Sequence, residues 1–237
     1  MTESSNRERI RLAFAGLPPE TRPSATRVAA IALIVTEVAG ALEVLLIERA
    51  TRDSDPWSGH MALPGGHAAP EDADLAATAE RETLEEVGLD LARDGSRLGR
   101  LSDCTPVRGV PIFVRPYVYW VESPPPLTLS HEVERALWVA IAPLQAGQMR
   151  SKVTFSRDGQ HLEFPAWDVF GHTVWGLTYR VLDEFFGRLS NQLLIVGKFR
   201  GRKDIFRCAR FHEETTSAGC RPRQGRSGHG PSSTKKR

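Results

Sequence analysis

The segment from Leu63 to Leu91, LPGGHAAPEDADLAATAERETLEEVGLDL, constrains the fold more than any other part of the chain. It begins near a glycine pair, continues into an acid-rich stretch with helical spacing, and has candidate caps for that helix at both ends. Asp72 or Asp74 can accept from the free backbone N–H groups of a helix N-terminus, and Gly88 suits the left-handed residue that follows a helix. The sequence therefore predicts a loop followed by a helix that ends just before Gly88.

This predicted helix has two faces with different chemistry. Its buried face is predicted by four residues at helical spacing: Ala76, Ala79, Thr83 and Val87. Glu82, Glu85 and Glu86 are spaced i, i+3 and i+4, so their carboxylates share another face within about 100° of arc. Like charges at this spacing destabilise a bare helix. The pattern indicates either a solvated acidic surface or a site for a cation, and Glu80 does not share this face.

The rest of the chain predicts a mixed sheet with helices packed on it. Apolar and β-branched runs predict six strands: 28–36, 42–49, 61–63, 97–104, 112–121 and 136–140. Two further runs, 153–156 and 161–164, flank Asp158-Gly159 and predict a hairpin. Helices are predicted at 7–15 and 171–189. This order of elements predicts an α/β fold.

Composition excludes several classes of protein. Hydrophobic residues make up 41% of the chain and charged residues 25%, as in ordinary globular domains. The three cysteines lie far apart and lack metal-site spacing, which argues against a disulfide scaffold or a structural zinc site. The longest apolar run, 28–35, is too short to span a bilayer, and the N-terminus does not resemble a signal peptide. We therefore expect a cytoplasmic protein without a membrane partner.

Charge divides the chain into a mildly acidic body and a basic tail. The overall net charge is +2, but the residues from Lys198 onward carry twelve Lys/Arg against three acids, a net charge of +9. We expect an N-terminal extension at 1–27, a globular domain at 28–190 and a basic extension at 191–237 that is disordered from about residue 215. The last twenty residues contain no aromatic side chain, so nucleic-acid binding is not predicted.

The acidic segment resembles the Nudix box, the defining motif of the Nudix hydrolase family. The matching residues are Gly66, Asp72, Arg81, Glu82, Thr83, Glu85, Glu86, Gly88 and Leu89. The chain departs from the common pattern in having Asp72 instead of glutamate, Thr83 instead of an aliphatic residue, and eight residues between Asp72 and Arg81. The aspartate and the longer gap are similar to the coenzyme A diphosphatase branch of the family.

The resemblance implies a Nudix-type α/β/α sandwich with a mixed β-sheet and a divalent cation, Mg²⁺ or Mn²⁺, as cofactor. Glu82, Glu85 and Glu86 are the implied metal ligands, with the carbonyl of Gly66 as a further ligand, because hard cations prefer oxygen donors. Glu82, Glu85 and Arg81 form the implied catalytic set. In it, Arg81 is expected to pair with an acid such as Asp72 and to hold the loop against the helix.

The implied substrate is a small nucleotide-type diphosphate. The segment before the box partly matches the coenzyme A signature through Leu45, Leu46, Arg49, Gly59, Pro64, Gly65 and Gly66, whereas Ile47, Ala50 and Leu63 do not match. Arg49, Arg52, His60 and Glu132 are the candidate substrate-binding residues. Their ordinary alternative is that they are surface arginines, a loop histidine and a solvated loop acid.

Three questions stay open at this point: the substrate, the class of function and the oligomeric state. The same motif is compatible with ADP-ribose, dinucleoside polyphosphates or other nucleotides as substrates. A different class of function is a regulatory module that binds a nucleotide without cleaving it, although such a module has no need of the three glutamates. The sequence also leaves open whether the chain forms a homodimer.

Overall fold

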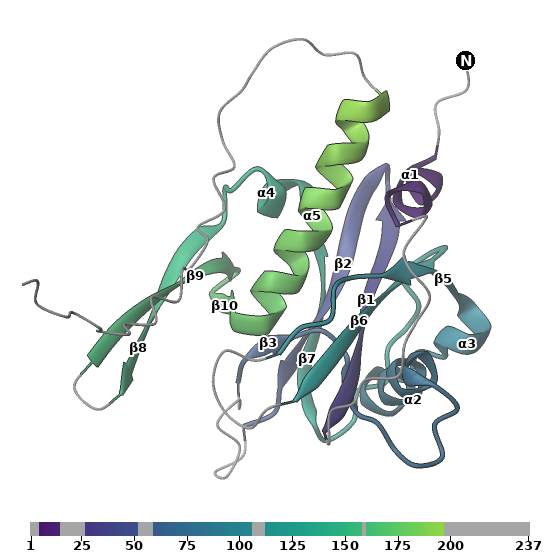
Figure 1. Ribbon diagram of the computed structural model, residues 1–237, viewed down its shortest axis with the longest axis horizontal. Coiled ribbons are helices and arrows are strands. Elements are labelled where there is room, and N and C mark those ends of the chain that lie inside the picture. The colour runs from purple at the N-terminus through teal and green to yellow at the C-terminus, as the bar shows by residue number, and fades with distance from the viewer. Residues whose placement is uncertain (1–4, 15–26, 52–58, 106–111, 158–159, 197–237) are drawn as a thin grey trace, which may run out of the picture. The chain divides into compact units, whose positions relative to one another are not determined.

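Strand β1 (Val28–Val38) is apolar on both faces, and it lies inside a seven-stranded mixed sheet. It pairs antiparallel with β2 (Ala41–Arg49) and parallel with β6 (Phe113–Val121). The remaining strands of this sheet are β3 (Met61–Ala62), β4 (Gly65–His67), β5 (Gly95–Arg100) and β7 (Val133–Ala140). The structure is a computed structural model that describes residues 5–14, 27–51, 59–105, 112–157 and 160–196 (Figure 1).

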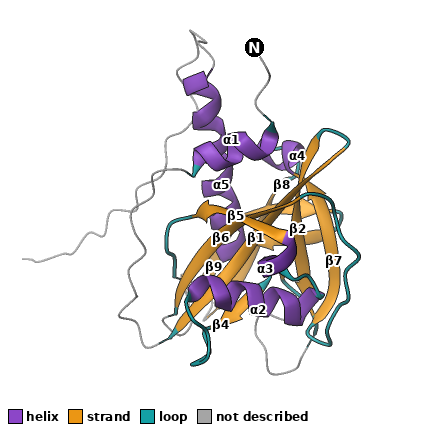
Figure 2. Cartoon of the chain, turned by 90° about the vertical axis from the view of Figure 1, so that its right-hand side faces the viewer, coloured by secondary structure: helices purple, strands orange, loops and turns teal. Residues whose placement is uncertain are grey.

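Alternating side chains of β1 enter two separate cores. Its odd-numbered residues from 29 to 35 pack with helices α1 (Asn6–Ala13) and α5 (Gly176–Val196). Its even-numbered residues from 30 to 34 pack with α2 (Leu75–Val87) and α3 (Leu91–Asp94). Figure 2 views the side on which α2 and α3 lie in front of the strands. The predicted α/β/α sandwich with a mixed sheet is confirmed.

Helix α2 has the caps and the buried face that the sequence predicts. The side chain of Asp74 accepts from the backbone N–H of Ala77 at 2.8 Å. Gly88 adopts φ 72° and donates its N–H to the carbonyl of Leu84 at 3.0 Å. The four residues of the predicted buried face are all buried, together with Thr78 and Glu86. The helix is therefore fixed at both ends beside the glycine pair of β4.

A small second sheet precedes the last helix. After α4 (Ile141–Gln145), strands β8 (Arg150–Arg157), β9 (Gln160–Val169) and β10 (His172–Trp175) form an antiparallel meander. The predicted hairpin is confirmed, although its turn residues 158–159 lie outside the described part of the chain. The prediction that the last helix begins at Gly171 is wrong, because residues 172–175 pair with β9 and the helix begins at Gly176.

Several helices and strands differ in their bounds from those that the sequence predicts. Within the predicted N-terminal extension, Ile10 and Phe14 are buried in the core that α5 shares, so this segment contributes to the fold. Helix α5 continues to Val196, past residue 190. The strand predicted at 97–104 ends at Arg100, and Cys104 forms an isolated bridge with Val114. Among the described helices, none is long and apolar enough to cross a membrane.

Candidate active site

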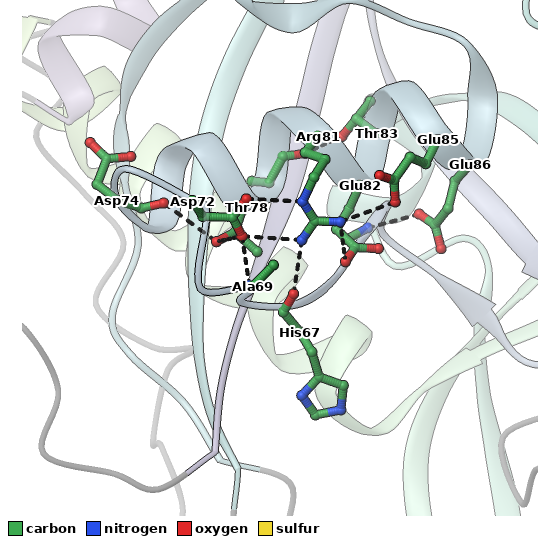
Figure 3. A network of polar contacts seen from close by, with 12 residues as sticks. His67, Ala69, Asp72, Asp74, Thr78, Arg81, Glu82, Thr83, Glu85 and Glu86 are labelled. Carbon is green, nitrogen blue, oxygen red and sulfur yellow. Dashed lines mark hydrogen bonds and ion pairs between the residues drawn. The ribbon is translucent and has the colours of Figure 1, made fainter.

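The loop before α2 is fastened to the helix by Asp72 and Arg81. The Arg81 guanidinium donates to both oxygens of Asp72, with Nε–Oδ1 at 2.9 Å and Nη2–Oδ2 at 3.1 Å. Oδ2 also accepts from the backbone N–H of Ala69 and from the hydroxyl of Thr78, each at 2.8 Å (Figure 3). The hydrogen bonds from Arg81 lower the pKa of Asp72 to about 2 despite its burial. The predicted pairing of Arg81 with Asp72 is confirmed.

Arg81 also contacts the strand and the acidic face of the helix. Its Nη2 donates to the carbonyl of His67 at 3.0 Å, and its Nη1 lies 3.0 Å from carboxylate oxygens of both Glu82 and Glu85. Figure 3 shows the guanidinium in the middle of these groups, with the His67 ring pointing away from them. The planar guanidinium of Arg81 therefore connects β4, the loop and α2. A lysine ammonium does not reproduce this geometry.

Gly66 lies directly against the carboxylate of Glu82. A Cβ placed on Gly66 would overlap the Glu82 carboxylate, so any other residue here would require that carboxylate to move. The register Ala30–Gly66 holds β4 beside the centre of the sheet. Burial raises the pKa of Glu82, and its contact with Arg81 opposes that shift. The close approach places a partly buried carboxylate against the backbone of β4.

Glu86 is the most buried acid of the helix. It is 5% exposed and accepts from the backbone N–H of Gly65 at 2.9 Å. Burial raises its pKa to about 7, the Gly65 hydrogen bond opposes the shift, and the charge of Glu82 adds to it. A carboxylate in this position is costly to ionise unless a positive charge lies nearby. Its surroundings therefore favour a cation as a neighbour.

The residues of this region fit a hard divalent cation. Glu82, Glu86 and the mainly exposed Glu85 offer carboxylate oxygens, and Gly66 brings the backbone close to one of them. Among the residues that the structure describes, no group of three or more His, Cys, Asp or Glu side chains is close enough together to hold a metal. Glu82 and Glu85 are instead engaged by Arg81, and Glu86 by Gly65. The implied ligand set stays a prediction.

Three of the candidate substrate residues lie at the end of the sheet that is near Glu86 of α2. The charge of Arg49 lowers the pKa of Glu86, and that of Glu132 raises it. The backbone N–H of Arg49 donates to the carbonyl of His60 at 3.1 Å, and the next residue donates to the carbonyl of Glu132 at 2.8 Å. Arg52 lies outside the described residues. The end of β2 thus brings Arg49, His60 and Glu132 together.

Sequence reasoning missed two polar contacts that position α2. The hydroxyl of Thr78 completes the set of donors around Asp72. On another side of the helix, the buried hydroxyl of Tyr119 from β6 donates to Glu80 at 2.8 Å. Helical spacing indicates that Glu80 is off the acidic face, but no local signal identifies a partner 39 residues away. These contacts make Thr78 and Glu80 supports of the helix.

Known proteins are similar to this chain in sequence. The NUDIX domain family model matches residues 25–157, more than half of the chain. Human mitochondrial coenzyme A diphosphatase NUDT8 is 30% identical over 185 residues, which cover 76% of this chain and 75% of that protein. A MutT/nudix family protein from Enterococcus faecalis has a structure with a TM-score of 0.49 and 18% identity, over 77% of this chain and 70% of that one.

An uncharacterized protein of Schizosaccharomyces pombe, C14C4.10c, is 38% identical over 116 residues. The match covers 46% of this chain but only 35% of the yeast protein, so the chain spans about a third of that relative's length. The family model and the human relative, by contrast, cover most of the domain that carries the acidic helix and the glycine pair. This chain belongs to the Nudix hydrolase family.

Proposed function

We propose that this chain is a metal-dependent diphosphatase whose substrate is a nucleoside diphosphate linked to another moiety, with coenzyme A or a derivative as the leading candidate. The observation that carries the proposal is the arrangement of α2, which presents Glu82, Glu85 and the buried Glu86 beside the glycine pair. The similarity to a protein named coenzyme A diphosphatase supports the choice of substrate.

The side chains divide into those that hold the cation and those that hold the site. Glu82, Glu85 and Glu86, with the carbonyl of Gly66, would bind Mg²⁺ or Mn²⁺. When bound, such a cation polarises the phosphoryl oxygens and lowers the pKa of an attacking water. Arg81 keeps the acidic face and the loop in register through Asp72, His67 and Glu85.

The proposed reaction is attack of water on one phosphorus of the diphosphate. A bond forms between the water oxygen and that phosphorus, and the bond from the phosphorus to the bridging oxygen breaks. The leaving phosphate keeps the electron pair of that bond, and the water proton passes to a carboxylate of the acidic face. Arg49, whose charge already acts on Glu86, is suited to bind the negative charge on the phosphates.

A substrate panel with product identification tests the proposal. The full chain is incubated with Mg²⁺ or Mn²⁺ and with coenzyme A, ADP-ribose or diadenosine tetraphosphate, and the products are identified by mass spectrometry. We expect coenzyme A to give adenosine 3′,5′-bisphosphate and 4′-phosphopantetheine, with one ¹⁸O atom incorporated when the reaction runs in H₂¹⁸O.

The panel separates the proposal from its alternatives. Faster turnover of ADP-ribose or diadenosine tetraphosphate would assign the site to that substrate. Nucleotide binding without hydrolysis across the whole panel would favour a regulatory module instead. Turnover that persists after chelation of divalent cations would contradict the metal-dependent mechanism.

A further inference from the structure

A β-bulge lies at the end of β2, at the point where the strand reaches Arg49. Glu48 pairs with Arg135 of β7, but Arg49 pairs with Val133, so Glu134 is an extra residue in β7. In a straight ladder Arg49 would lie opposite Glu134. A β-bulge changes the direction of the side chains around it and is frequent beside active sites. The course of β7 at the bulge therefore helps to determine the surroundings of Arg49.

The side chains of Glu48 and Arg49 point to opposite faces of the central sheet. Leu46 belongs to the core on the α5 face, and Ile47 belongs to the core on the α2 face. The extra residue is in β7, so the alternation of β2 continues and places Glu48 on the α5 side and Arg49 on the α2 side. The electrostatic effect of Arg49 on Glu86 of α2 agrees with this direction. Contacts of Glu48 can thus act on Arg49 from the far face of the sheet.

The carboxylate of Glu48 connects three strands on the α5 face. Its Oε2 atom is 3.4 Å from His172 Nδ1 on β10 and 3.5 Å from Arg135 Nε on β7. Arg135 Nη1 is in turn 3.3 Å from His172 Nε2. The side chain of Glu48 is only 17% exposed, and burying a carboxylate is costly unless a positive charge lies close to it. These contacts hold β7 at the residue that directly follows the extra Glu134.

The same short strand, β10, also supports the backbone partner of Arg49. The backbone N–H of Arg49 donates to the carbonyl of His60 at 3.1 Å, and the carbonyl of Arg49 accepts from Gly59 at 2.9 Å. The ring of His60 packs edge-on against Trp175 of β10, with the centroids 5.3 Å apart. Figure 1 shows β10 next to β3, which begins directly after His60. Strand β10 therefore contacts both Glu48, which precedes Arg49, and His60, which pairs with it.

We propose that Glu48 is a positioning residue: its contacts with β7 and β10 fix the bulge that directs Arg49 towards the acidic face of α2. This inference rests on the proposed function, in which Arg49 binds the negative charge of the phosphates. Glu48 itself lies on the other face of the sheet. Its negative charge would by itself weaken the binding of a nearby anion, so a favourable effect of Glu48 on phosphate binding has to act through Arg49.

A double-mutant cycle with Glu48→Gln and Arg49→Ala tests this role. Glutamine keeps the size of the side chain and removes the charge that attracts Arg135. We expect the affinity of the full chain for inorganic diphosphate with Mg²⁺, measured by titration calorimetry, to fall about fivefold in Glu48→Gln and about tenfold in Arg49→Ala. In the Arg49→Ala background there is no guanidinium to direct, so adding Glu48→Gln should cause no further loss.

Two further variants make the result independent of a single substitution. His172→Ala removes the same contact from the side of β10, and it should lower the diphosphate affinity to a similar extent only when Arg49 is present. Glu163→Ala is the matched control, because it removes from the small sheet a glutamate that pairs with Lys152 at 2.7 Å. Its diphosphate affinity should equal that of the wild type.

Three results would overturn the inference. These are an absence of diphosphate binding by the wild type, an affinity of Glu48→Gln equal to or higher than that of the wild type, and equal losses with and without Arg49. The last result would give Glu48 a structural role that does not depend on Arg49. A loss that requires Arg49, in a chain that hydrolyses no substrate of the panel, would support the positioning role and contradict only the proposed function. Hydrolysis of coenzyme A together with unchanged affinity in Glu48→Gln would contradict only the positioning role.

Discussion

The two faces of the central sheet are both covered by helices, but they are built from different residues. On the α5 face the core is rich in aromatic rings, with Phe14 stacked on Phe185 at 5.6 Å and Trp167 against Phe186 at 5.6 Å. On the α2 face, apolar residues of β1 meet a helix that also buries Glu86 and two threonines. One face maximises apolar burial, whereas the other includes polar groups that are costly to bury.

This difference indicates that the two faces of the sheet have different roles. The α5 face stabilises the domain, and the α2 face holds a charged arrangement whose stability comes from hydrogen bonds and ion pairs around Arg81. Locally unfavourable residues are expected at functional sites and are offset by favourable packing elsewhere. Variants on the two faces should therefore separate stability from activity.

The largest effect on stability is expected for Phe185→Ala on the α5 face. Phe185 is fully buried between Phe14 and Phe186, so truncation leaves a cavity and should lower the free energy of unfolding by about 3–5 kcal/mol. Denaturant titration measures this change. Turnover per folded molecule should stay near the wild-type value at a temperature where the variant is folded. A selective loss of activity without loss of stability would contradict the comparison.

On the α2 face, Glu85→Gln should lower activity and leave stability nearly unchanged, the reverse of what is expected for Phe185→Ala. Removing one implied metal ligand should lower kcat/KM by about 10³-fold, because a bound cation contributes several kcal/mol to such reactions. The exposed Glu85 contributes little to the core, so the thermal midpoint should change little. Steady-state kinetics and thermal unfolding measure the two quantities.

Glu80→Gln is the control for that experiment. It removes a negative charge from the same helix, but glutamine can still accept from Tyr119. Its kcat/KM should stay within about twofold of the wild type. Equal losses in both variants would indicate that the net charge of α2, not the acidic face, determines activity.

Gly66→Ala should lower activity by about 10²-fold through geometry alone. The new Cβ has to displace the Glu82 carboxylate, and small displacements of catalytic groups reduce rates on this scale. Far-UV circular dichroism should show that the fold is retained. Wild-type activity in this variant would show that the close contact of Gly66 with Glu82 is not required.

The smallest effect is expected for the pH dependence of stability. Because Arg81 lowers the pKa of Asp72 to about 2, this pair stabilises the fold above pH ~4, and the contribution is lost as pH falls towards 2. Asp72→Asn should be less stable than the wild type at neutral pH and should approach it in acid. Denaturant titrations from pH 7 to pH 2.5 measure the difference, and a gap that does not narrow would contradict this account.

Much of the fold could be predicted because its signals are local. The caps Asp74 and Gly88 and the spacing of apolar residues predict the ends and the buried face of α2. The start of α5 could not be predicted in this way. Residues 172–175 are compatible with a helix by themselves and form a strand because β9 is available to pair with them.

The candidate site was predictable in its members but not in its arrangement. The acidic residues and Arg81 follow from spacing and from resemblance to the Nudix box. Their environments differ, however: Glu86 is buried, Glu82 lies against Gly66, and Glu85 is largely exposed. These differences arise from β4 packing beside the helix, a contact between segments that no local pattern specifies.

By itself, the sequence determined the family, the order of the main elements and the residues of the acidic helix, because each depends on spacing along one segment. Only the tertiary structure decided which acid is buried and which residues gather at the end of β2. These features depend on strands and helices that are distant in the chain and meet only when the sheet is formed.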